Sequence, residues 1–435
     1  MNKKIENNLV PRLRFPEFTN IEGWERKELG EISEIVRGGS PRPIQDYLTT
    51  KKDGLNWLKI ADVPSDSKYI TKTKERVIQK ALSSTREVKN GDLILSNSMS
   101  FGRPYILKIT TCIHDGWIAI RKISSVTFED YLYYYISSEV SQRYFLSQAA
   151  GAAVKNLNAE IIKLLPTYFS KNKKEQKKIA DCLSSLDDLI SAENERLNAL
   201  KEHKKGLMQQ LFPVEGEKVP KLRFPEFKDN GEWEEKELIK LADKKVRWSF
   251  TGGPFGSNLK ATDYTPNGIR IIQLQNIGEG RFIDKYKIFT SQDKADELLG
   301  CNIYSGDIIL SKMGEPVGRA CIIPENLKRA VMASDGIRFV VDEKHYDKYF
   351  IFTLINSEKI RETIDKRATG STRKRIGLDE LKQIPLLIPS SKDEQTKIGE
   401  LIFSLDTQIL SSETRIDSLN LHKKGLMQGL FPNIN

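Results

Sequence analysis

Residues 203–213 read HKKGLMQQLFP and residues 422–432 read HKKGLMQGLFP, so ten of eleven positions match at an offset of 219. A second matched pair opens each copy, because residues 11–18 read PRLRFPEF and residues 220–227 read PKLRFPEF, at an offset of 209. The offset grows between these anchors, so each copy keeps its ends while its middle accepts insertions. The chain of 435 residues is therefore an internal duplication, with more than one domain.

Each HKKGLM segment ends a long stretch in which seam residues step by four and three. The seam residues are Ile179, Leu183, Leu186, Ile190, Glu193, Leu197, Leu200, Lys204, Leu207 and Leu211 in the first copy, and Ile398, Ile402, Leu405, Ile409, Ser412, Ile416, Leu419, Lys423, Leu426 and Leu430 in the second. A sustained step of this kind predicts long helices packed along a seam. Two such helices of equal length, one after each copy, are expected to pack antiparallel as a coiled coil. Polar residues fall at the same seam positions in both copies, where they fix register.

The middles of the two copies share a weaker pattern. GDLILS at residues 91–96 matches GDIILS at residues 306–311, and a Gly-Arg pair and then an Asp-Gly pair follow each of them. Short β-prone runs lie at residues 93–96, 106–109 and 337–341, and residues 128–147 and 347–366 have a helical pattern. We therefore expect an α+β fold, with two similar α/β domains related by a pseudo-twofold axis.

The expected domain boundaries follow from these patterns. A first globular domain spans residues 1–170 and a central helix spans residues 171–213. A linker with the second globular domain spans residues 214–389, and a C-terminal helix spans residues 390–435.

Composition narrows the class of partner. Lys and Arg number 69 against 59 for Asp and Glu, a net charge of +10 that favours a polyanion such as nucleic acid or an anionic membrane. No apolar run is long enough to span a bilayer, and the N-terminal lysines are not followed by the apolar stretch of a signal peptide. Four scattered cysteines without a CxxC motif predict reduced thiols in a cytoplasmic protein, and four scattered histidines give no metal-ligand spacing.

Sequence motifs for catalysis are missing. The chain contains no GxxxxGK[ST] loop, no GxGxxG turn, no GxSxG elbow and no HExxH helix, nor the Asn/Asp-Pro-Pro-aromatic motif of methyltransferases. Glu380 and Lys382 have a nuclease-like spacing, but they fall in a helical repeat element whose counterpart begins at Glu160, so we interpret them as structural.

Loops that combine glycine with basic and amide side chains occur at matched places in both copies. Glycine lets the backbone approach phosphates, while Arg, Asn and Gln can pair with base edges. The loop at residues 369–375 suits phosphate binding, because it joins small hydroxyl groups to three cations. The predicted DNA-binding residues are Arg37, Gly38, Gly39, Ser40, Arg42, Asn97, Ser98, Arg103, Lys155, Asn156, Gly252, Gly253, Asn258, Lys260, Lys312, Arg319, Thr369, Ser371, Thr372, Arg373 and Lys374.

Over its whole length the chain resembles the specificity subunit of type I restriction-modification systems. The resemblance rests on the LRFPEF…W…KEL opening of each half, the GDLILS…GR middle, the Glu-Gln pairs at 175–176 and 394–395, and above all KKGLMQxLFP. It implies two target-recognition domains that each read one half of a bipartite site in double-stranded DNA. It also implies that the helices set the spacing and dock two methyltransferase subunits, which restriction and translocase subunits join.

In that family the chemistry belongs to other chains, so the resemblance implies a non-catalytic subunit without a cofactor of its own. S-adenosylmethionine, ATP and Mg would be held by partner subunits. Two alternatives remain open from sequence: an enzyme with an unrecognised site, and a stand-alone DNA-binding or coiled-coil scaffold protein. The first copy departs slightly from the family's circular pattern, because only a short N-terminal arm precedes it.

Overall fold

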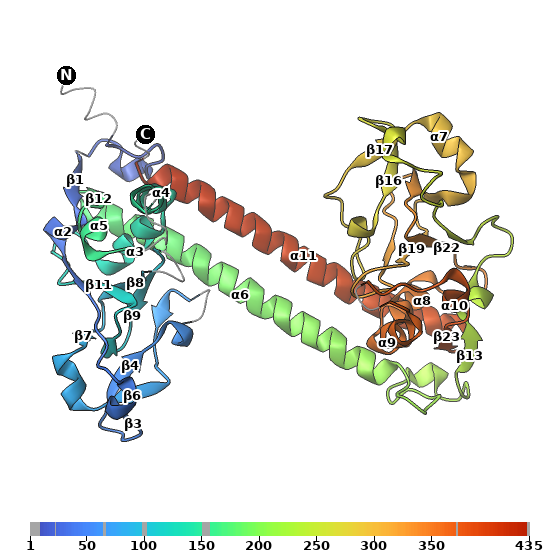
Figure 1. The fold of residues 1–435 in the computed structure, drawn as a ribbon, viewed down its shortest axis with the longest axis horizontal. Coiled ribbons are helices and arrows are strands. Elements are labelled where there is room, and N and C mark those ends of the chain that lie inside the picture. Colours follow the sequence, from blue (N-terminus) through green and yellow to red (C-terminus); the bar gives the residue numbers. More distant parts are fainter. Residues whose placement is uncertain are drawn as a thin grey trace. The chain divides into compact units, whose positions relative to one another are not determined.

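The computed structural model describes residues 9–21, 23–63, 67–97, 102–149, 157–370 and 373–432. The chain divides into two compact units (Figure 1), one made of residues 1–195 with 413–435 and the other of residues 196–412. Each unit contains one globular domain and a part of each long helix. Within the described residues, no helix combines the length and the apolar character needed to cross a membrane.

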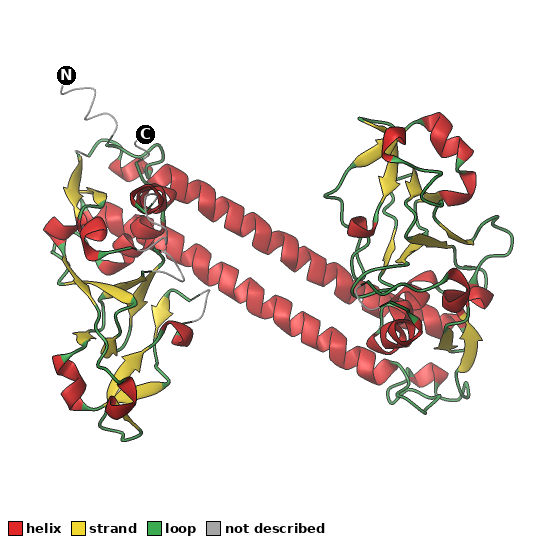
Figure 2. Cartoon of the chain, viewed as in Figure 1, coloured by secondary structure: helices red, strands yellow, loops and turns green. Residues whose placement is uncertain are grey.

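The first domain contains two five-stranded sheets and a two-stranded ribbon (Figure 2). The strands of the first sheet are, in spatial order, β2 (Glu34–Arg37), β11 (Trp117–Arg121), β8 (Leu93–Ser96), β9 (Pro104–Leu107) and β5 (Tyr69–Ile70). The strands of the second sheet are β3 (Leu48–Thr49), β6 (Glu75–Val77), β4 (Leu55–Leu58), β10 (Thr111–Ile113) and β7 (Arg86–Val88). The ribbon pairs β1 (Trp24–Glu28) with β12 (Pro166–Ser170).

The second domain repeats this plan. The strands of its first sheet are, in spatial order, β14 (Phe250–Gly252), β22 (Gly336–Phe339), β19 (Ile308–Ser311) and β20 (Ala320–Ile322). The strands of its second sheet are β15 (Tyr264–Thr265), β17 (Ile288–Thr290), β16 (Ile269–Ile272), β21 (Arg329–Met332) and β18 (Asn302–Tyr304). Its ribbon pairs β13 (Glu234–Glu237) with β23 (Pro385–Ile388). Strand for strand, only β5 lacks a counterpart in the part of the second copy that the structure describes. The two copies therefore share one α+β topology, as the repeat predicts.

The central strand of the first sheet explains why its sequence is continuously apolar. In β8, Leu93 and Leu95 contribute to the core beneath the helices, while Ile94 contributes to a second core with Leu58 and Ile113 from the other sheet. Successive side chains of a strand point to opposite faces, so a strand that is covered on both sides needs apolar residues at every position. In the second copy, strand β19 of the GDIILS segment also contributes to a different core from each of its two faces.

Short helices complete each domain. They are α2 (Leu29–Ile32), α3 (Glu129–Ser137), α4 (Glu139–Gln148) and α5 (Ala159–Lys163) in the first, and α7 (Gln292–Glu297), α8 (Lys348–Ile355), α9 (Glu358–Arg367) and α10 (Leu378–Lys382) in the second. The helical stretches 128–147 and 347–366 are each broken into two helices. Ser138 and Ser357 adopt extended backbone at these breaks, and the Ser138 hydroxyl caps α4 by accepting from the Ser141 amide. Serine favours such N-cap positions, where its side chain replaces a missing helical partner.

The two long helices are α6 (Lys173–Leu211) and α11 (Lys392–Leu430), each of 39 residues. All the seam residues predicted from the four-three step are buried or half-buried, whereas most of the residues between them are exposed. In the first unit, Asp187 of α6 pairs with Lys423 of α11, and Glu193 pairs with Arg415 at 3.0 Å. The later residue of α6 thus pairs with the earlier residue of α11, which confirms that the two helices run antiparallel.

Polar seam residues are partnered in the same way in both units. The Asp187 carboxylate accepts from the Lys423 ammonium and from the Tyr134 hydroxyl at 2.7 Å. In the second unit, Asp406 accepts from Lys204 at 2.6 Å and from the Tyr349 hydroxyl at 2.9 Å. A half-buried carboxylate with one cation and one hydroxyl donor has its hydrogen-bonding capacity met only in one register.

The LFP segment at the end of each long helix enters the core of a domain. Phe431 lies 5.7 Å from Tyr131 and 5.6 Å from Tyr135, measured between ring centroids, and is 1% exposed. Phe212 lies 5.6 Å from Phe350 and 6.1 Å from Trp233. Each domain is thus completed by the helix end that follows the other copy, which explains why this segment is nearly identical in both.

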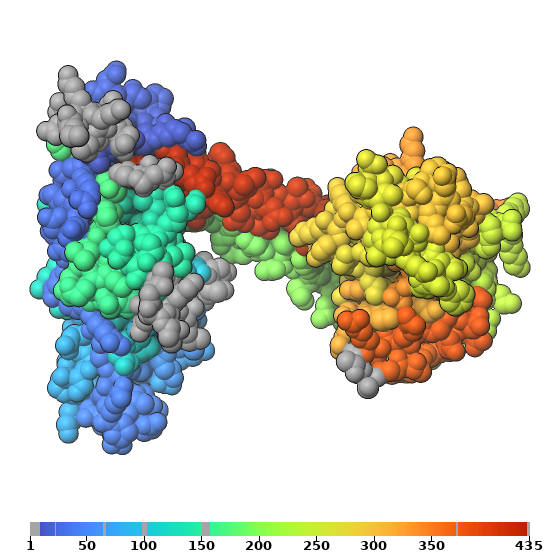
Figure 3. Space-filling view, turned by 45° about the horizontal axis from the view of Figure 1, so that its top comes forward, coloured from blue at the N-terminus to red at the C-terminus, as the bar shows by residue number. Residues whose placement is uncertain are grey.

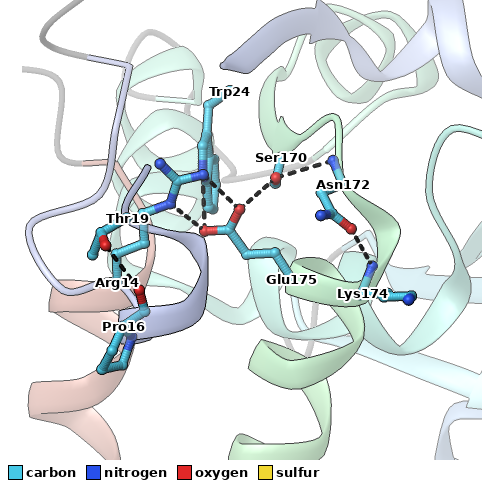
Figure 4. A network of polar contacts seen from close by, with 8 residues as sticks. All are labelled: Arg14, Pro16, Thr19, Trp24, Ser170, Asn172, Lys174 and Glu175. Atoms are coloured by element: carbon cyan, nitrogen blue, oxygen red, sulfur yellow. Dashed lines mark hydrogen bonds and ion pairs between the residues drawn. The ribbon is translucent and has the colours of Figure 1, made fainter. Parts of the chain in front are cut away.

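A buried carboxylate fixes the start of each long helix to the LRFPEF arm. In Figure 4, Glu175 accepts hydrogen bonds from Arg14 at 2.6 and 2.8 Å and from the Ser170 hydroxyl at 2.5 Å, with the Trp24 indole at 3.4 Å. In the second copy, Arg223 donates to Glu394 twice at 2.8 Å, and Trp233 donates at 3.3 Å. The PEF residues of each arm form a short 3-10 helix.

We predict that Glu394→Gln destabilises the second domain by about 3–5 kcal/mol, because it leaves the buried Arg223 without its counter-charge. Urea-induced unfolding followed by tryptophan fluorescence measures the change, since Trp233 lies against Glu394. The control is Glu226→Gln, which removes an exposed pair with Lys397 and should change little. Equal unfolding midpoints for Glu394→Gln and the wild type would show that the pair contributes nothing.

Candidate nucleic-acid interface

In the first domain, the predicted loop residues gather around Asp115. The Asp115 carboxylate accepts from the Ser40 hydroxyl at 2.8 Å and lies 3.5 Å from the Arg42 guanidinium. Its backbone carbonyl accepts from Arg37 at 3.0 Å and from the Asn97 amide at 3.2 Å. The structure thus brings together residues from three segments, and the side chain of Arg42 is 83% exposed at the tip of its loop.

The glycines of this loop are explained by packing inside the domain. A Cβ on Gly38 would lie 2.0 Å from the carbonyl oxygen of His114, and one on Gly39 would lie 2.4 Å from that of Ser84. Their amides donate to Trp117 and Ile113 at 2.9 and 3.1 Å. The close approach that requires glycine is therefore an approach to the domain's own backbone.

His114 supports the turn that presents Asp115. Its Nδ1 atom accepts from the Gly116 amide at 2.8 Å, and its ring lies 6.2 Å from the rings of Trp57 and Trp117. Burial lowers the pKa of His114, an effect that the nearby Asp115 carboxylate opposes. The Ser40 hydroxyl, by donating to Asp115, lowers the pKa of that carboxyl. Both shifts favour a charged Asp115 carboxylate beside a neutral His114 imidazole.

The second domain is organised in the same way around Asp335. Its carboxylate accepts from Arg375 at 2.6 Å, and its backbone carbonyl accepts from the Lys312 amide at 2.7 Å. The Gly253 amide donates to Gly336 at 2.8 Å, and a Cβ on Gly253 would lie 1.9 Å from the Ala333 carbonyl oxygen. The sequence pattern identified the repeated Asp-Gly pair, but it did not identify the aspartate as the centre of the site.

The basic loop of the second domain is closed by backbone hydrogen bonds between Thr369 and Arg375, at 2.8 and 2.9 Å. Lys374 pairs with Asp365, so its charge is balanced inside the domain. Arg373 is exposed, and its side chain forms no ion pair with any described residue. Of the three cations in this loop, Arg373 is thus the one most available to a phosphate.

A pocket of about 310 Å³ lies beside Asp335. It is lined by Pro254, Gly256, Leu259, Tyr264, Gln273, Leu274, Gln275, Ala333, Ser334 and Asp335. The Gln275 amide donates to the Gln273 side-chain oxygen at 2.8 Å, so two amides lie side by side at its wall. Such groups can pair with adenine edges, and sequence reasoning missed them because no motif marks them. The predicted residues Asn258 and Lys260 are exposed, and they lie close in sequence to the pocket-lining residues Gly256 and Leu259.

The repeated Gly-Arg pairs serve the domain interior. Gly102 and Gly318 have φ angles of 68° and 71°, which glycine adopts without strain. Arg103 is half-buried over the Tyr105 ring, with its guanidinium 5.3 Å from the ring centroid and 3.4 Å from the Ser67 carbonyl. Arg319 donates to the Leu274 carbonyl at 3.5 Å. Both arginines thus contact their own domain.

The remaining predicted residues divide into two groups. Asn97 is buried, with 6% of its surface exposed, and Gly252 ends strand β14. Ser98, Lys155, Asn156, Ser371 and Thr372 lie outside the described residues. Across the part of the chain that is described, no cluster of three His, Cys, Asp or Glu side chains could hold a metal ion.

We predict that the first domain loses stability as the pH falls through about 6.5, the usual histidine pKa. The folded His114 binds its proton less readily than the unfolded one, so its contribution is complete above that pH and declines below it. Urea unfolding at several pH values between about 8 and 5 checks this in wild type and His114→Asn, whose amide oxygen can replace Nδ1. The variant should lose part of the pH dependence. Identical pH profiles for His114→Asn and wild type would refute the role of His114.

Comparisons with known proteins identify the family of this chain. The family model for the type I restriction modification DNA specificity domain matches residues 21–202 and again residues 257–421. Similar curated proteins include the type I restriction enzyme MjaVIII and MjaIX specificity subunits of Methanocaldococcus jannaschii. Both are 23% identical to this chain, over 430 and 424 residues, and each alignment covers 94% of this chain and 92% of the relative.

Solved structures share the fold. The S subunit of the type I restriction-modification system from M. genitalium aligns with a TM-score of 0.63 at 15% identity, covering 98% of this chain and all of that one. A chain from a structural study of complex assembly and conformational transition in the type I R-M system aligns with a TM-score of 0.55 at 14% identity, covering 97% of this chain and all of that one. Since the family model matches well over half of its length, the chain belongs to the family of the type I restriction-modification DNA specificity domain, of which it carries two copies.

Proposed function

We propose that this chain is the DNA-specificity subunit of a type I restriction-modification complex, and that each domain reads one half of a bipartite site in double-stranded DNA. The observation that carries this proposal is one scaffold used twice with different exposed groups. In both copies an Asp-Gly turn holds a loop cation, Arg42 on Asp115 and Arg375 on Asp335, while the neighbouring loop residues differ. Both arginine side chains stay largely exposed despite these pairs, so their remaining N–H groups can contact phosphates or guanine edges.

Methyl transfer and cleavage then belong to partner subunits, which would hold S-adenosylmethionine, ATP and Mg. The long helices dock two methyltransferase subunits and set the distance between the half-sites. The relatives described above are named as specificity subunits, which supports this division of labour. Incubation of the isolated chain with labelled S-adenosylmethionine and DNA tests it, since methyl transfer by the purified chain alone would favour an enzyme instead.

We predict that the two domains specify their half-sites independently. Replacing residues 20–165 with the corresponding segment of a relative should change one half of the recognised site and leave the other half intact. Sequencing of methylated sites in a host that carries the variant with its methylating partners provides the measurement. A replacement that altered both halves together would contradict the proposal, and the reciprocal replacement in the second domain is the matched control.

We predict that lengthening both long helices widens the unread spacer without changing the bases read. Duplicating Leu197–Leu200 in α6 and Ile416–Leu419 in α11 adds about 6 Å to each helix at 1.5 Å per residue. That length corresponds to one or two base pairs at about 3.4 Å each. The duplication is made in both helices because in α6 alone it would separate either Asp187 from Lys423 or Lys204 from Asp406.

Mapping of methylated sites again provides the measurement, and the α6-only duplication is the control, which should weaken assembly. New half-site bases combined with an unchanged spacer would show that the helices do not set the spacing.

A further inference from the structure

Phe255 is the most exposed of the large apolar side chains in the described residues, with 83% of its surface accessible. It lies in the loop 253–258 that follows strand β14, in the second unit, whose surface Figure 3 shows coloured by residue number. Burying a phenylalanine stabilises a protein by about 1.5–3 kcal/mol, and the domain forgoes that gain here. The stability of the fold therefore does not explain why a phenylalanine occupies this exposed position.

The loop is anchored at its base and open at its tip. Gly253 cannot carry a Cβ, because the Ala333 carbonyl oxygen would lie 1.9 Å away. For Gly252 and Gly256, by contrast, an added Cβ would meet no atom within 4 Å. Gly252 is held in strand β14, where it pairs with Ile337, whereas Gly256 follows Phe255 and leaves the backbone on that side of the ring free to change conformation.

The surroundings of the tip combine polar and apolar groups. Pro254 and Gly256, the two neighbours of Phe255, line the pocket whose wall carries Gln273, Gln275 and the Asp335 turn. Asn258 and Lys260 follow in the same segment and are exposed. Tyr264, Leu259 and Leu274 also line that pocket, yet Phe255 is the most exposed of these apolar side chains. One highly exposed ring beside amide and cationic groups differs from the broad apolar core of a protein-docking surface. It matches a surface that contacts phosphates and base edges and inserts one ring between bases.

We propose that Phe255 is a stacking wedge, which inserts its ring between adjacent base pairs in the half-site read by the second domain. The proposal deepens the proposed function and rests on it. Partial unstacking of one base step lets the duplex follow the protein surface, and the ring recovers the lost stacking through its own contact with a base. The step most easily opened, a pyrimidine–purine step, is the one that this wedge selects.

The corresponding loop of the first domain ends differently. Arg42 is exposed there to the same extent, with 83% of its side chain accessible, and it carries a charge held by Asp115. In this proposal, Arg42 contacts DNA through its charge and Phe255 contacts DNA through stacking. The two modes are distinguishable, because only a charged contact releases counterions and steepens the dependence of binding on salt.

The experiment uses the full chain assembled with its methylating partners, and duplexes that carry the site mapped by methylation sequencing. Phe255→Ala should weaken binding about 5- to 150-fold, the range for loss of one aromatic–base stack, with an unchanged salt slope. Phe255→Trp should keep near-wild-type affinity. The matched control in the same domain is Arg373→Ala, which should reduce the salt slope by about one unit.

A second measurement locates the wedge. With 2-aminopurine placed in turn at each step of the second half-site, wild type should raise fluorescence at one step, and Phe255→Ala should abolish that increase. Equal affinity and equal fluorescence for Phe255→Ala and wild type would overturn the wedge. Loss of partner subunits from the purified Phe255→Ala complex, with DNA binding retained, would overturn it in favour of a protein contact. If wild type itself bound no mapped site, the proposed function would fail together with the wedge.

Discussion

The buried carboxylates Glu175 and Glu394 are the constraint on which the architecture depends. Both are fully buried, and a buried charge is tolerated only when its counter-charge and hydrogen-bond donors are all in place. The donors come from the LRFPEF arm, the first strand and, in the first copy, the last strand as well. Residues more than 150 positions apart must therefore be kept together. This explains why the openings and helix starts of the two copies are so alike.

The long helices add a second constraint of the same kind. Asp187 and Asp406 each need a lysine from the other long helix and a tyrosine from a neighbouring domain helix. Apolar seams alone tolerate a shift by one heptad, whereas these partially buried triads do not. The Leu13 amide donates to the Gly429 carbonyl at 2.8 Å, and Leu222 donates to Gln210 at 2.9 Å in the matching place. A backbone hydrogen bond thus joins each LRFPEF arm to the end of a long helix at the same place in both copies.

Sequence reasoning predicted the parts of the fold that obey local periodicity. The seam residues, the duplicated α+β domains and strand β8 follow from spacing, burial on two faces and repetition. The breaks at Ser138 and Ser357 did not follow, because apolar periodicity continues across them and only backbone geometry reveals the cap. At the candidate interface, the glycine loops and their cations were predicted. Asp115, Asp335 and His114 were not, because an acidic residue in a basic site is recognised only by the partners that surround it.

The contrast between the buried network and the loop tips gives a physical basis for the independent specificities that we predict for the two domains. A change at Glu394 or Asp406 alters several partners at once, so such positions accept few residues. A change at the exposed Phe255, or at Arg42 with its exposed pair to Asp115, alters few contacts in the free protein, and its cost in stability is small. Residues that read a ligand and contribute nothing to the fold can diverge in each copy separately. An α+β scaffold with a rigid Asp-Gly turn and a replaceable tip therefore permits new recognition without a new fold.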